Sequence, residues 1–257
     1  MTDEVVRERR GNVEIVRLNR PEVRNAMNPA VMSGLGMAMI EAEADPEVRA
    51  VVLTGTGDKA FCAGMDLRAF AGGETMTAPD PAAMDGFTRL MRGRVTVPLI
   101  GAANATALAG GFELLLGCDL VVASSEAKFG VPEVKRGLFA AGGGTFLATR
   151  IAYAAAMELT LTGDTIDAER AYALGLVNAV VAPEEVLDTA LGFAQRIAAN
   201  GPLGVAATKE LVRLAVSDPA RAETRLAELQ RSVFSSEDAK EGATAFVEKR
   251  PPVWRGR

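Results

Sequence analysis

The stretch from Pro98 to Leu120, PLIGAANATALAGGFELLLGCDL, constrains the fold of this chain most. Its apolar beginning, Pro98 to Ala103, predicts a buried strand, and a loop of small residues follows. Gly110 and Gly111 then open a predicted helix whose first turn carries Glu113. Two interpretations stay open. The glycines and free N–H groups of the first turn can bind an oxygen that gains negative charge, or they permit close helix packing while Glu113 complements the helix dipole.

The composition limits the chemistry open to this chain. None of the 257 residues is histidine, which excludes Ser-His-Asp and Cys-His mechanisms and removes the usual zinc ligand. Carboxylates are therefore the first candidates for acid–base catalysis. The two cysteines, Cys62 and Cys118, give no disulfide framework. The net charge of −5 argues against a general nucleic-acid binder, no apolar run approaches the ~20 residues of a membrane span, and the first residues contain no signal-peptide core. We expect a soluble, cytoplasmic protein.

The hydrophobic pattern predicts an α/β core followed by a helical C-terminal part. Two strands, Val5 to Arg10 and Val13 to Leu18, flank a turn and predict an opening hairpin. Asn28 and Pro29 cap a predicted helix that ends near residue 44. Further strands are predicted over residues 49–54, 120–123, 127–130 and 175–181, and further helices over 80–94, 152–160, 167–174, 183–199, 202–217, 219–234 and 236–249.

Four segments of the predicted core bear on a possible binding or catalytic site. In the loop after the strand at 49–54, the Met65 N–H is a candidate second oxyanion donor, and the alternative is a tight turn with Asp66 as a helix N-cap. Residues 71–81 predict a mobile surface loop that could act as a lid. Glu133 begins a helical turn, where an acid is also favoured by the helix dipole alone. The glycine-rich loop at 136–145 lacks the spacing of a phosphate-binding loop.

Five motifs in register carry a resemblance to a known family. They are GDKAFCAGMDL, NATALAGGFELLLGCDLVVAS, AKFGVPEVKRGL, LTGDTIDAERAYALGLVNAVV and EGATAFVEKR. Together they resemble the enoyl-CoA hydratase/isomerase (crotonase) family over nearly the whole chain. The resemblance implies an α/β fold with a crotonase-like ββα superhelix over residues 1–199 and a helical trimerisation part over residues 200–257.

The resemblance also implies site residues. The backbone N–H groups of Met65 and Gly110 correspond to the family's oxyanion hole, and Glu113 and Glu133 correspond to its two catalytic glutamates. Because both glutamates are present, the resemblance favours a hydratase. We expect Glu113 to act mainly on the water and Glu133 to deliver a proton, although two such carboxyls titrate as a unit.

Four further positions correspond to the part of the family's site that binds the coenzyme A moiety. The backbone at Ala63 and Asp66 lies along the expected cofactor path. Arg24 is a candidate partner for a phosphate, and a solvated surface arginine is the alternative. Lys249 is a candidate contact from a neighbouring subunit.

The implied activity is addition of water to a trans-2-enoyl-CoA thioester, which gives a 3-hydroxyacyl-CoA. Alternatives are 3-enoyl/2-enoyl-CoA isomerisation, a non-catalytic acyl-CoA-binding protein and an RNA-binding member of the fold. The resemblance further implies a homotrimer or dimer of trimers and no permanently bound cofactor, since coenzyme A is part of the substrate. No metal, nucleic-acid or membrane partner is expected.

Overall fold

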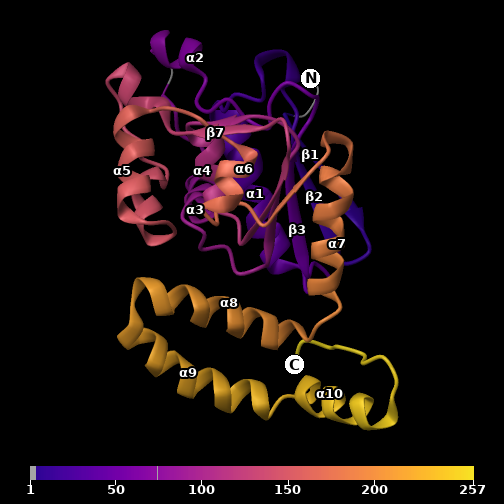
Figure 1. Ribbon diagram of the computed structural model, residues 1–257. Helices are drawn as coiled ribbons and strands as arrows, with labels where there is room; N and C mark the ends of the chain where they lie inside the picture. Colours follow the sequence, from indigo (N-terminus) through magenta and orange to yellow (C-terminus); the bar gives the residue numbers. More distant parts are fainter. Residues whose placement is uncertain (1–3, 74) are drawn as a thin grey trace.

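The chain forms a six-stranded sheet with helices on both faces and a helical arm at its C-terminal end (Figure 1). The structure is a computed structural model that describes residues 4–73 and 75–257. The predicted hairpin is confirmed: β1 (Val5–Arg10) and β2 (Val13–Leu18) pair antiparallel. Gly11 in the turn between them has a φ of 60°, a conformation that glycine adopts without strain.

The other strands of this sheet run parallel to β2. They are β3 (Ala50–Gly55), β4 (Leu99–Ala103), β6 (Leu120–Ser124) and β9 (Ala179–Val181), and the sheet order is β1-β2-β3-β4-β6-β9. Every residue of β3 and β4 is buried, as expected for parallel strands covered on both faces. The loops after β3 and β4, which carry the candidate site, leave the same edge of the sheet.

Helices cover the sheet in two layers. α1 (Pro29–Ala44) and α3 (Pro81–Met91) pack on one face, and α7 (Val186–Ala198) packs on the other. The apolar side chains of the strands alternate between these two cores, as the pleat requires. α1 and α3 approach closely at two glycines, because a Cβ on Gly36 would lie 1.8 Å from the Ala83 carbonyl oxygen. The start of α1 agrees with the prediction, since the Asn28 side chain accepts a hydrogen bond from Val31 N.

A second, three-stranded sheet adjoins the site. Its strands are β5 (Ala107–Leu108), β7 (Lys128–Gly130) and β8 (Ile166–Asp167), in the order β5-β7-β8. The sequence predicted β7 but neither β5 nor β8. The remaining elements of the core are short: η1 (Pro21–Val23), α2 (Leu67–Ala71), α4 (Gly110–Leu116), η2 (Pro132–Arg136), η3 (Gly144–Thr149), α5 (Tyr153–Thr162), α6 (Ala168–Ala173) and η4 (Pro183–Glu185).

The C-terminal arm consists of α8 (Pro202–Ser217), α9 (Pro219–Phe234) and α10 (Glu237–Glu248), which lie below the core in Figure 1. No residue of α8 or α9 is buried. The chain end returns to the start of the arm, where Trp254 Nε1 donates to the Ala199 carbonyl at 2.8 Å and the Trp254 carbonyl accepts from Arg49 at 3.2 Å. The arm is joined to the core at the α7–α8 junction and along α8, where Lys209 donates to the Val97 carbonyl and Arg213 donates to the Gly93 carbonyl.

Candidate active site

The segment from residue 61 to 66 is held on both sides, and this orients the backbone of Met65. On one side, Met27 N donates to the Gly64 carbonyl, and the Met27 carbonyl accepts from Asp66 N, each at 2.8 Å. On the other side the segment bonds to β5. Because Met27 pairs with the residues before and after Met65, the Met65 N–H points away from Met27 and toward the side where α4 begins.

The two predicted oxyanion donors belong to adjacent backbones. A Cβ on Gly64 would lie 3.3 Å from Gly110 N, and a Cβ on Gly110 would lie 3.8 Å from the Gly64 Cα. Any side chain at either glycine would stand between the two segments. Across residues 4–73 and 75–257, neither the Met65 N–H nor the Gly110 N–H has a hydrogen-bond acceptor. Both amides are therefore available to an oxygen supplied from outside the chain.

Ala109, just before α4, has an unusual backbone conformation. Its φ is 52° and its ψ is −132°, a combination that an L residue with a Cβ rarely adopts. Ala109 N donates to the Gly130 carbonyl at 2.9 Å, and its own carbonyl accepts from Phe112 N and Glu113 N. These bonds hold the conformation, which turns the chain from β5 into α4 and sets the direction of the Gly110 N–H.

Glu113 is buried and fixed by the backbone of a distant loop. Its Oε1 accepts hydrogen bonds from Gly143 N at 2.8 Å and Gly144 N at 2.9 Å. Only 4% of the surface of Glu113 is exposed. A Cβ on Gly110 would lie 3.9 Å from Glu113 Oε2, so the second oxygen lies on the side of the free amides.

Gly143 and Gly144 are functional candidates that sequence reasoning missed. The sequence shows a glycine-rich loop there, and the structure gives a reason for it. A Cβ on Gly142 would lie 2.7 Å from Glu113 Oε2, and one on Gly144 would lie 3.4 Å from Glu113 Oε1. The run of glycines was therefore the sequence feature that could have indicated this role. A loop without side chains can bring two amides close to a buried carboxylate.

Glu133 is half-buried at the start of η2 and has a different electrostatic setting. Burial raises the pKa of its carboxyl above the ordinary value, and the nearby charge of Glu113 raises it further. A hydrogen bond from its own backbone and the charge of Arg136 oppose the rise. Its Oε2 is buried and has no hydrogen-bond partner in the described part of the chain. The site thus holds one carboxyl group fixed by amides and one whose pKa is raised by burial.

The predicted coenzyme A contacts lie in two places. Ala63 N donates to the Arg24 carbonyl at 3.0 Å, which brings these two residues together beside the Met65 segment. The exposed Arg24 side chain has no hydrogen bond or ion pair with any other described residue. Lys249 is exposed at the C-terminal end of α10, in the arm rather than beside Glu113.

The Asp66 side chain follows the alternative interpretation, that of a helix cap. It accepts hydrogen bonds from Arg68 N and Ala69 N at the start of α2, and it forms an ion pair with Arg20 at 3.2 Å. The pKa of Asp66 is lowered by these hydrogen bonds and by Arg20, against an opposing effect of burial. The backbone of Asp66 is also engaged, because its N–H donates to the Met27 carbonyl and its carbonyl accepts from Phe70 N.

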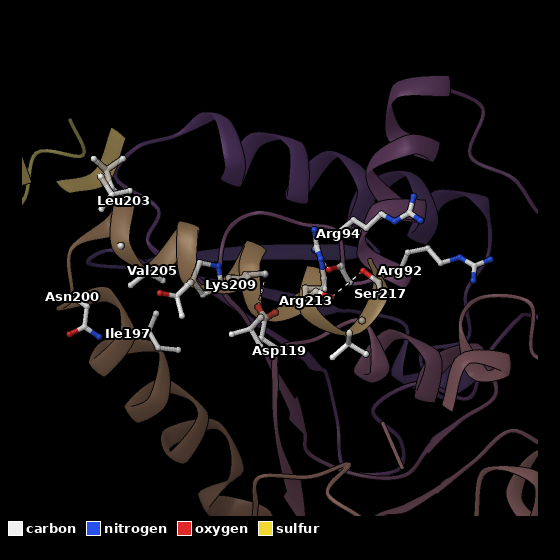
Figure 2. Close-up of a pocket in the computed structure, with 18 of the residues that line it drawn as sticks. Arg92, Arg94, Asp119, Ile197, Asn200, Leu203, Val205, Lys209, Arg213 and Ser217 are labelled. Atoms are coloured by element: carbon white, nitrogen blue, oxygen red, sulfur yellow. Dashed lines mark hydrogen bonds and ion pairs between the residues drawn. The ribbon is translucent and has the colours of Figure 1, made fainter. Parts of the chain in front are cut away.

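A large cavity of about 1520 Å³ lies between the core and the C-terminal arm (Figure 2). In it Lys209 of α8 donates to the Asp119 carboxylate at 2.5 Å and to the Val97 carbonyl at 2.8 Å. Burial lowers the pKa of Lys209, and Asp119 opposes that shift. The cavity reaches the candidate site at Met91 and Gly143, next to Glu113, but it does not contain the two glutamates.

Residues 4–73 and 75–257 lack two other kinds of site. These residues contain no cluster of acidic and cysteine side chains that could hold a metal ion. They also contain no helix that is long and apolar enough to cross a membrane. Burial raises the pKa of both cysteine thiols, that of Cys62 to about 12, so neither is a ready nucleophile.

The fold and this geometry define a class of protein: an α/β scaffold with two neighbouring free backbone amides, a buried carboxyl group next to them and a second carboxyl group that interacts with the first. Comparison with known sequences leads to the same class. The family model described as "Enoyl-CoA hydratase/isomerase" matches residues 8–257, and the chain belongs to this family. The predicted crotonase-like fold is thereby confirmed.

Individual relatives are similar over their whole length. An enoyl-CoA hydratase of Mycobacterium tuberculosis is 40% identical, over 97% of this chain and 96% of that protein. A carnitinyl-CoA dehydratase of Salmonella paratyphi A is 38% identical, over 97% of both chains. Among solved structures, an enoyl-CoA hydratase from Mycobacterium tuberculosis is 47% identical, covers 99% of this chain and 100% of its own, and has a TM-score of 0.90.

Proposed function

We propose that this enzyme adds water to the 2,3 double bond of a trans-2-enoyl-CoA thioester, giving a 3-hydroxyacyl-CoA. One observation carries the proposal: Glu113 is held by two amides next to the free N–H group of Gly110, and it is near enough to Glu133 for its charge to raise the pKa of that carboxyl. The family and the hydratases among its relatives support the same class of enzyme.

The oxyanion hole is the first part of the mechanism. An α,β-unsaturated thioester becomes a good electrophile only when its carbonyl oxygen is stabilised as it gains negative charge. The N–H groups of Met65 and Gly110 would bind that oxygen, an interaction worth on the order of 3 kcal/mol per donor. Their position on rigid backbone, rather than on side chains, means that little reorganisation accompanies the reaction.

The glutamates divide the proton transfers. Charged Glu113 would orient a water molecule and accept its proton as the oxygen adds to carbon 3 of the acyl group. Protonated Glu133 would deliver a proton to carbon 2 as the enolate collapses. The surroundings of Glu133 support this division, because burial and the charge of Glu113 raise the pKa of its carboxyl, which is the direction that a proton donor needs.

The coenzyme A moiety would lie along the loop from Ala63 to Asp66, with Arg24 near a phosphate. Two observations support that placement: the Arg24 backbone contacts this loop at Ala63, and the Arg24 side chain is exposed. Coenzyme A enters as part of the substrate, and no other cofactor is required by the proposed steps.

A solvent-oxygen experiment tests the reaction type. Enoyl-CoA esters of graded acyl length are incubated with the protein in ¹⁸O-labelled water, and one labelled oxygen is expected in each product molecule. Glu113→Gln and Glu133→Gln should each lose at least about 100-fold in kcat while still binding the thioester. Turnover without labelled oxygen would favour 3-enoyl/2-enoyl isomerisation, and unchanged turnover in both variants would refute the site assignment.

A carnitinyl-CoA thioester is a second candidate substrate. Relatives named carnitinyl-CoA dehydratase share 38% identity over nearly the full chain, and hydration and dehydration are the two directions of one reaction. The same two carboxyls could remove water from a hydroxylated, cationic acyl group. Comparing kcat/KM for carnitinyl-CoA with that for a plain 3-hydroxyacyl-CoA of equal length decides between the two substrates.

A homotrimer or dimer of trimers, assembled through residues 200–257, is part of the proposal. Apolar side chains exposed on the arm support it, including Phe234, Phe246 and Val247. Lys249 follows directly on these residues and would reach a neighbouring subunit's coenzyme A. A cytoplasmic location is also proposed, and the two unpaired cysteines support a reducing compartment.

A further inference from the structure

The loop that holds Glu113 is itself held by an arginine outside the predicted site. Arg92 follows α3, and its Nη2 donates to the Ala141 carbonyl at 3.1 Å. Its guanidinium also lies 4.8 Å from the centre of the Phe146 ring. Ala141 precedes Gly143 and Gly144, and Phe146 follows them. One guanidinium therefore contacts both ends of the short segment whose amides bind Glu113.

The end of α3 supports the same segment by packing. A Cβ on Gly142 would lie 2.3 Å from Met91 Cε, and one on Gly143 would lie 3.2 Å from the Met91 carbonyl oxygen. The glycines are thus in direct contact with the residue before Arg92. Arg92 and Met91 both line the large cavity, in which Figure 2 shows the Arg92 side chain.

This segment needs an external restraint. Three consecutive glycines, 142 to 144, have more backbone freedom than any other residues, and Gly143 has a φ of 156°. An amide that drifts by about 1 Å no longer holds a carboxylate in a reactive position, and such a shift can cost about 100-fold in rate. The contacts of Arg92 reduce that freedom at both ends.

We propose that Arg92 is a positioning residue that clamps residues 141–146 so that Gly143 N and Gly144 N stay on the Glu113 carboxylate. It has no hydrogen bond or ion pair with Glu113 among the described residues and acts through the loop. The proposal rests on the proposed function, in which Glu113 activates water.

The test compares single variants of Arg92, Arg94 and Phe146, and one double variant, with the wild-type protein. Arg92→Met keeps the apolar stem and removes both contacts, whereas Arg92→Lys retains a cation that can reach the Ala141 carbonyl. Arg94→Met is the matched control, because the Arg94 side chain also lines the cavity but has no hydrogen bond or ion pair with the other described residues. Hydration is measured as kcat per binding site, counted by titration with the CoA thioester, so that misfolded protein does not contribute.

We expect Arg92→Met to lower kcat by about 10-fold with little change in KM, and Arg92→Lys to recover most of that loss. Arg94→Met should match the wild type. Phe146→Leu should lower kcat less than Arg92→Met, and the double variant should lose less than the product of the two single effects, because both changes release one clamp.

Hydrogen exchange gives a readout that does not depend on turnover. The peptide covering residues 138–147 should exchange faster in Arg92→Met than in the wild type or Arg94→Met, while peptides from α1 and α7 stay unchanged. The proposal is overturned if Arg92→Met retains its kcat, if Arg94→Met loses as much, or if the loop exchanges at the wild-type rate. A wild-type protein without hydratase activity would instead refute the proposed function, and the exchange rates would still decide whether Arg92 holds the loop.

Discussion

At the scale of single residues, Glu133 couples the proposed chemistry to stability. Its folded-state pKa lies above the ordinary 4.5, mainly because of burial. Between those two values the native protein binds more protons than the unfolded chain, so this group makes the free energy of unfolding fall as pH rises. Above the folded-state pKa, the buried charge remains as a cost that a neutral glutamine does not have.

We therefore expect Glu133→Gln to gain stability relative to the wild type as pH rises from 4 to 8. Denaturant unfolding at several pH values, followed by fluorescence, measures the difference. Glu126→Gln is the control, because Glu126 is exposed and the same substitution there removes a carboxylate that is not buried. A difference between wild type and Glu133→Gln that stays constant over this pH range would contradict the raised pKa.

Variants of Asp66 distinguish a structural role of its side chain from a role in substrate binding. Its carboxylate caps α2 and pairs with Arg20, so we expect side-chain changes to affect stability more than substrate binding. Asp66→Ala should lower the free energy of unfolding by about 1 kcal/mol through loss of the cap, whereas Asp66→Asn should retain most of the cap. KM for the CoA thioester should stay near the wild-type value in Asp66→Asn. A large rise in that KM would show that the carboxylate contacts the substrate after all.

At the scale of elements, the position of α4 depends on a glycine. A Cβ on Gly111 would lie 2.1 Å from the Cys62 carbonyl oxygen, so α4 could not stay against the loop that carries Met65. We expect Gly111→Ala to destabilise the protein by about 2–4 kcal/mol and to reduce kcat, because the Gly110 N–H moves with the helix.

Gly192 in α7 provides the matched control for Gly111. Nothing lies within 4 Å of a Cβ placed there, so Gly192→Ala should stabilise the protein by about 0.5–1 kcal/mol through helix propensity alone. Thermal unfolding of the two variants checks both signs. If Gly111→Ala were as well tolerated as Gly192→Ala, the close contact between α4 and the Cys62 segment would not exist in solution.

Elements with clear periodicity were predictable, and those shaped by tertiary contacts were not. The bounds of β1 and β2 match the prediction, and α1 begins at the predicted Pro29 because local capping defines it. β5 and β8 have two residues each, too few to show any alternation. The motifs indicated both glutamates. Gly143 and Gly144 are 30 and 31 residues away from Glu113 in the sequence, so no local pattern predicts their hydrogen bonds to it.

At the scale of the whole molecule, the C-terminal arm is the part that the rest of the chain covers least. α8 and α9 have no buried residue, although both are 16 residues long, and the arm adjoins the large cavity against the core. Helices gain most of their stability from tertiary packing rather than from propensity. Because α8 and α9 have no buried face, we predict that another surface packs against the arm.

A second copy of the chain is the partner we expect on this surface. Phe246 is 86% exposed and Phe234 is 76% exposed, which is uncommon for phenylalanines on a protein that stays monomeric. Light scattering coupled to size exclusion should give the mass of three or six chains, and Phe246→Glu should shift the distribution toward the monomer because a charge cannot be buried in an apolar contact. Tyr172→Glu, a similar change on an exposed aromatic of the core, should leave the mass unchanged. A wild-type protein with the mass of one chain at micromolar concentration would refute the assembly, and it would also remove Lys249 from the proposed site, since that residue lies on the arm and depends on a neighbour to reach the substrate.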